Sequence, residues 1–143
     1  MYSKAEMQQM KREFWTGFAE TYPRKWLLYD TKIKDFALKF DADRRTASVM
    51  IEVSHRDRET RIRYFEKLES LKSLLLQDYL PDAVYSSGIV LESGKEVSRV
   101  SVVLEGVSLS NRATWPSIYD FFSEKMTALE LFFYEFEDFI KDV

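Results

Sequence analysis

Hydrophobic residues in the first part of the chain recur every three or four positions, the spacing of one face of an α-helix. Ser3 stands before this run and Glu6 follows three residues later, a pair typical of a capped helix start. Pro23 lies just beyond the run, where a helix would end. The pattern predicts a helix over residues 4–21. Its buried face would carry Met7, Met10, Phe14 and Phe18.

The spacing then changes to alternation of hydrophobic and polar residues, which is typical of strands with one buried face. Alternation over residues 36–40 and 47–53 is interrupted by the polar turn DADRR. A second pair of runs, over residues 83–92 and 96–106, flanks the turn SGK. The chain is therefore predicted to form two β-hairpins. Gly88, inside the third strand, indicates a bulge or a close backbone contact.

Helical spacing returns over residues 57–79 and again over residues 114–141. Asp57 is a good N-cap for the first of these helices, and Pro116 suits the first turn of the second. One apolar seam runs the length of the last helix. Its members are Trp115, Tyr119, Phe122, Met126, Leu129, Phe133, Phe136 and Ile140.

The order helix, hairpin, helix, hairpin, helix predicts an α+β fold in which an antiparallel sheet packs against helices. The long C-terminal helix would lie across that sheet. A length of 143 residues fits one domain, so we expect a single domain over residues 1–143.

Composition narrows the classes of function without choosing among them. Hydrophobic residues make up 45% of the chain, and its charges nearly cancel to −3. There is no cysteine, which excludes thiol nucleophiles and thiolate metal sites, and the four glycines form no phosphate-binding loop. No signal peptide or membrane-spanning run is visible. We expect a cytoplasmic protein without a cofactor or a membrane partner.

The candidates for chemistry lie near the only histidine. His55 could serve as a general base and Glu52 is a second catalytic candidate, although no residue is assigned as catalytic. Asp41, Asp43 and Glu52 could hold a divalent metal, as in nuclease-like enzymes. The lysine that such sites place beside the metal is missing after Glu52. The simpler interpretation is a charged hairpin turn, a solvent-facing Glu52 and a strand-to-helix connection at His55.

Basic residues gather in two segments that could approach each other and bind nucleic acid. Acidic residues are interleaved with them, which favours a solvated face over a phosphate-binding patch. The residues of the predicted cluster are Arg44, Arg45, Arg56, Arg58, Arg61 and Arg63.

The last helix carries more large apolar side chains than one face can hold. A surplus face would have to meet another molecule, because large exposed apolar patches are unusual on monomers. We therefore expect a homodimer or a docking face for another domain. Its leading contact residues would be Phe121, Phe132 and Phe139.

Several short motifs resemble those of a bacterial family, domain of unknown function 4268 (DUF4268), and the resemblance covers nearly all 143 residues. The motifs are Phe14-Trp15, Ile33-Lys34-Asp35, Phe40-Asp41-Ala42-Asp43, Ile51-Glu52 with His55, and Trp115-Pro116. Relatives often have proline after the histidine, where this chain has Arg56, which weakens the idea of a rigid turn there. The resemblance implies little about activity. Some members look like C-terminal appendages to nuclease-like domains, which would imply an accessory role in DNA-associated restriction or defence systems.

Together these observations favour a non-enzymatic interaction and dimerisation domain, accessory to a DNA-associated system. Two alternatives stay open: a metal-dependent nuclease-like enzyme using Asp41, Asp43 and Glu52, and a nucleic-acid binder using the arginine cluster.

Overall fold

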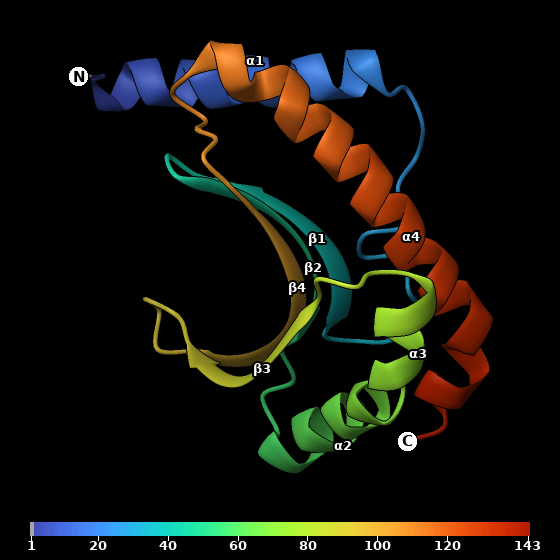
Figure 1. The fold of residues 1–143 in the computed structure, drawn as a ribbon. Coiled ribbons are helices and arrows are strands. Elements are labelled where there is room, and N and C mark those ends of the chain that lie inside the picture. The colour runs from blue at the N-terminus through green and yellow to red at the C-terminus, as the bar shows by residue number, and fades with distance from the viewer. Residues whose placement is uncertain (1) are drawn as a thin grey trace.

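The computed structural model describes residues 2–143, and Figure 1 shows a curved sheet with the helices against its convex side. The concave side faces away from all of the labelled helices. In chain order the elements are α1 (Lys4–Thr21), β1 (Phe36–Ala42), β2 (Thr46–Val53), α2 (Arg58–Ser70), α3 (Lys72–Asp78), β3 (Val84–Val90), β4 (Glu96–Glu105), the 3-10 turn η1 (Arg112–Thr114) and α4 (Trp115–Lys141).

The sheet is antiparallel throughout, and its strand order is β1-β2-β4-β3. Both predicted hairpins form. In the second hairpin β4 pairs with β2, and β3 lies at the edge of the sheet. The register shifts between Ser86 and Ile89, where Gly88 adopts a φ of 67°. The predicted bulge is thus confirmed, as is the α+β class with its long C-terminal helix.

The helices begin where their caps predict. The Ser3 hydroxyl accepts a hydrogen bond from the Glu6 amide at 3.1 Å, and α1 covers the predicted residues. The helix expected over residues 57–79 is instead two helices that meet at Leu71. There the Ser70 hydroxyl donates to the Lys67 carbonyl at 2.7 Å, a local bond that competes with the regular helical pattern.

The core lies between the convex face of the sheet and the helices. Val49, Ile51 and Val100 point into it from the two central strands and are at most 1% exposed. Helix α4 crosses the sheet and meets α1, where the Tyr119 hydroxyl donates to the Phe14 carbonyl at 2.6 Å. Gly17 makes this contact possible, because a Cβ there would lie 2.6 Å from that hydroxyl.

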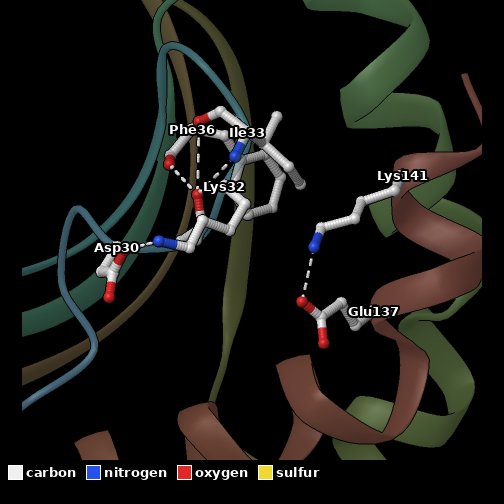
Figure 2. A network of polar contacts seen from close by, with 7 residues as sticks. Asp30, Lys32, Ile33, Phe36, Glu137 and Lys141 are labelled. Carbon is white, nitrogen blue, oxygen red and sulfur yellow. Dashed lines mark hydrogen bonds and ion pairs between the residues drawn. The ribbon is translucent and has the colours of Figure 1, made fainter.

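The segment between α1 and β1 is a series of turns that follows the rim of the sheet. Buried Thr31 holds its second half, since the hydroxyl donates to the Phe36 carbonyl at 2.7 Å and accepts from the Ile33 amide at 3.2 Å. Asp30 and Lys32 form an ion pair on the outside of the same turn (Figure 2). Figure 2 also shows the pair between Lys141 and Glu137 on α4. The turn fixes the start of β1.

None of the helices described over residues 2–143 combines the length and the apolar composition needed to cross a bilayer.

Candidate functional site

A pocket of about 750 Å³ opens where β2 leads into α2. We call it the His55 pocket. Its walls come from the start of β1, the β2–α2 connection, the first turn of α2 and the turn between β3 and β4. The residues that line it are Asp35, Ser54, His55, Arg56, Arg58, Arg61, Ser93, Gly94, Lys95 and Glu96.

The cap of α2 fixes the β2–α2 connection and with it the position of His55. Asp57 caps α2, with its carboxylate accepting from the Thr60 amide at 3.0 Å, so residues 54–57 form a short and fixed link. The imidazole stacks flat on the Tyr64 ring, with centroids 4.7 Å apart and planes 4° apart. His55 is 9% exposed, and its Nδ1 is buried without a hydrogen-bond partner among residues 2–143.

The surroundings of His55 favour its neutral form. Burial lowers the pKa of the imidazole, and the Arg61 guanidinium acts in the same direction. The Asp35 carboxylate, the Lys34 carbonyl and the Asp57 carboxylate oppose this effect without outweighing it. The ring is therefore uncharged at neutral pH, so the positive charge of the pocket comes from other side chains.

Arg61 joins the walls of the pocket. It is 6% exposed, and its Nη1 donates to the His55 carbonyl at 2.8 Å. Its Nη2 forms an ion pair with Glu96 at the start of β4. This arginine thus neutralises the one carboxylate of β4 in the pocket and ties α2 to the second hairpin.

The remaining charges make the pocket attractive to anions. Four cationic side chains and two carboxylates line it, so its net charge is +2 although the whole chain carries −3. Arg56, Arg58 and Lys95 are exposed and form no ion pair with any described residue. Guanidinium groups suit phosphate and carboxylate oxygens, which they can bind in a bidentate manner.

The predicted arginine cluster is only partly brought together. Arg56, Arg58 and Arg61 share the His55 pocket, whereas Arg63 lines a separate groove beside α4. Arg44 and Arg45 lie in the β1–β2 turn, at the other end of β2. Eight residues of strand separate them from the pocket, roughly 26 Å. The two basic segments therefore form no common patch.

The three predicted metal ligands are not brought together either. Asp43 organises the β1–β2 turn, accepting from the Arg45 and Thr46 amides at 2.7 and 2.8 Å, and these bonds lower its pKa. Asp41 and Glu52 both lie on the concave face of the sheet. Glu52 pairs with Ala37 across the two strands, and Asp41 lies four residues farther along β1, roughly 13 Å from Ala37. Within residues 2–143, no three His, Cys, Asp or Glu side chains form a group that could hold a metal ion.

Glu52 has a structural environment that its sequence position does not suggest. It points to the concave face as predicted, yet it is 5% exposed rather than solvent-facing. Its carboxylate accepts from Lys39 at 2.6 Å and from Arg99 Nε at 2.9 Å. Burial would raise the pKa of Glu52, but these two cations outweigh it and lower the pKa. Glu52 does not line the His55 pocket, so it does not pair with His55.

The predicted dimer contacts need correction. Phe132 is 0% exposed and Phe121 is 9% exposed, so both belong to the core of their own chain. Phe132 packs against Tyr79, with ring centroids 5.5 Å apart. Only Phe139 of the three is open to solvent, at 43%. It lies beside a groove of about 450 Å³ between α2 and the end of α4.

Among the pocket residues that escape prediction from the sequence are Lys95 and Asp35. The sequence marks Lys95 only as part of a turn, and Asp35 only as part of a family motif. Both lie far along the chain from Arg56, and the order of the strands brings them together. The available signal was weak: a cation beside Gly94 at a hairpin tip, and an aspartate directly before a strand.

A comparison with protein families gives a match. A family model described as Domain of unknown function (DUF4268) matches residues 10–137. No curated protein and no solved structure matches the chain. The matched segment runs from α1 into the last turns of α4, so it includes every residue that lines the His55 pocket.

Proposed function

We propose that this chain, which belongs to the DUF4268 family, is a binding domain rather than an enzyme, and that its His55 pocket holds phosphate groups of a nucleic acid. The observation that carries the proposal is the set of three exposed cations, Arg56, Arg58 and Lys95, around a pocket of about 750 Å³. Repulsion among them would be relieved by an anion between them.

The charge distribution supports a local contact rather than general attraction. The chain as a whole is acidic, so a polyanion would be repelled from most of its surface and attracted to this pocket. Two of the candidate groups have structural partners: Glu52 is held by Lys39 and Arg99, and Asp43 by its own turn. These contacts support a binding role over a nuclease-like one.

The biological setting that fits is an accessory one. The resemblance to domains attached to nuclease-like proteins suggests that this chain adds a nucleic-acid contact to a restriction or defence system. In that role the domain would hold the nucleic acid while another protein performs the reaction.

The test is fluorescence anisotropy with labelled 12-nucleotide DNA, as a single strand and as a duplex, at 50 and 200 mM salt. The triple variant Arg56→Glu, Arg58→Glu and Lys95→Glu should bind roughly tenfold or more weakly than wild type. Its affinity should also depend less on salt, by about one unit of slope for each lost phosphate contact.

The matched control is Lys11→Glu, Arg44→Glu and Arg45→Glu, which changes net charge equally at exposed positions outside the pocket. It should stay within about threefold of wild type, since screening weakens distant charges. Equal losses in both variants, or no wild-type binding at 50 mM salt, would overturn the proposed site. Cleavage of the DNA by purified protein with added Mg²⁺ or Mn²⁺ would overturn the non-enzymatic role.

Self-association is a second part of the proposed function, and it is favoured by the groove beside Phe139. The α2 wall of this groove carries Arg63, Lys67 and Glu66, a net charge of +1, and its other wall carries Asp142. In a two-fold dimer each wall would meet its opposite charge on the second copy, around a centre formed by the two Phe139 rings.

A further inference from the structure

A second hollow adjoins the His55 pocket and extends it onto the concave side of the sheet. It has a volume of about 340 Å³ and shares Asp35, Ser54 and Lys95 with the His55 pocket. Beyond these shared residues its walls add Lys34, Lys39, Glu52 and Tyr29, so the hollow as a whole has three lysines, two carboxylates and a net charge of +1. The cationic lining thus continues past the rim of the sheet, where a chain of phosphates could follow it.

Tyr29 is the most exposed large hydrophobic residue of the described chain, at 72%. It belongs to the turns before β1, and Lys39 Nζ lies 5.6 Å from the centre of its ring. Tyr29 also lines a third, mainly apolar hollow of about 240 Å³, together with Trp15 and Phe40. An open aromatic ring is therefore placed between a cationic hollow and an apolar one.

This combination matches the chemistry of an unpaired nucleotide. Proteins that bind single strands combine a positive groove along the backbone with aromatic rings on which bases stack. In a duplex the bases already stack on one another, so an exposed ring such as Tyr29 gains little from it.

We infer that the two adjoining hollows hold a single-stranded nucleic acid, with phosphates at Arg56, Arg58 and Lys95 and a base stacked on Tyr29. The inference rests on the proposed function and specifies the form of the nucleic acid. Lys39 would contact the strand near the same base, while its ammonium continues to pair with Glu52. Ribose and deoxyribose strands share this chemistry.

The experiment compares four 12-nucleotide probes: single-stranded DNA, single-stranded RNA, duplex DNA, and an abasic DNA strand that keeps the phosphates without bases. Wild type should bind both single strands roughly tenfold more tightly than the abasic strand or the duplex. A preference between DNA and RNA beyond tenfold would identify which of the two is the partner.

Variants of Tyr29 separate stacking from charge. Tyr29→Ala should lose roughly tenfold in affinity for the single strands and nothing for the abasic strand, whereas Tyr29→Phe should bind like wild type. Tyr134→Ala is the matched control, because Tyr134 is an exposed tyrosine on α4, at 56%. It should leave all four affinities unchanged.

The outcomes distinguish the two proposals. Equal affinity for all four probes, lost in the Arg56, Arg58 and Lys95 triple variant, would overturn the single-strand inference and leave the phosphate pocket standing. The same holds if Tyr29→Ala has no effect on the single strands. Absence of binding to every probe would overturn both proposals together.

Discussion

His55 shows at the scale of one residue how burial decides charge. The ring is stacked on Tyr64 and enclosed, so water cannot stabilise an imidazolium. Asp35 and Asp57 attract a proton to it, while Arg61 repels one, and burial decides the balance. Folding therefore favours the neutral ring.

We predict that His55 titrates below the ordinary histidine pKa of 6.5. Well above pH 6.5, from about pH 7.5 upward, the ring is neutral in both the folded and the unfolded chain, so it does not affect stability there. As pH falls below 6.5 the unfolded chain takes up the proton first, and the free energy of unfolding should decrease.

The measurement is simple because the chain has one histidine, and its imidazole protons give one NMR titration curve. The variant His55→Gln should lose the part of the stability change that occurs between pH 7.5 and 5.5. A His55 pKa at or above 6.5 would contradict the predicted neutral ring.

Helices α2 and α4 provide the prediction at the scale of elements. Phe139 is 43% exposed beside a groove with Lys67 on one wall, and the Lys67 ammonium lies 4.1 Å from the ring centre. If this groove forms the proposed two-fold contact, light scattering after size exclusion should give a dimer mass at tens of micromolar. Phe139→Glu should restore the monomer, because it places a carboxylate at the centre of the apolar contact.

Tyr134→Glu is the control, since Tyr134 is equally open but lies about 140° around the helix from Phe139. It should remain dimeric. A wild-type monomer at these concentrations, or two monomeric variants, would rule out the contact at Phe139.

The elements could be predicted from the sequence because their signals are local. Ser3 and Asp57 mark helix starts by side-chain bonds that span three residues. Alternation likewise predicts β1, β2 and β4, and the turn signal SGK places β3 before β4. The outward face of α4 could not be predicted in the same way, because the burial of Phe132 depends on where α3 docks. Helical spacing shows which side chains share a face, but not how many faces the fold covers.

The whole molecule determines the candidate site. Asp35, His55 and Lys95 line one pocket because β4, rather than β3, pairs with β2. This pairing joins strands that are far apart along the chain, so no local pattern in the sequence reports it. The same pairing places Arg99 beside Glu52, which turns an apparent metal ligand into a buried ion pair. His55 and its neighbouring arginines were therefore found from the sequence, whereas their partners across the sheet were not.

The two sides of the curved sheet differ in what covers them. Its convex side is covered by helices, while its concave side has no helix over it (Figure 1). The turns before β1, which carry Tyr29, follow the rim of the sheet. The His55 pocket lies at this rim, between the covered and the open side. The central claim is that a nucleic acid binds there.

The most direct measurement follows the His55 imidazole resonances while single-stranded 12-nucleotide DNA is added to the protein. The account predicts that these resonances shift in a saturable manner, and that half of the shift occurs at the DNA concentration that gives half-maximal anisotropy. The shift should disappear in the Arg56, Arg58 and Lys95 triple variant. Binding that leaves the His55 resonances unmoved would place the nucleic acid elsewhere and contradict the claim.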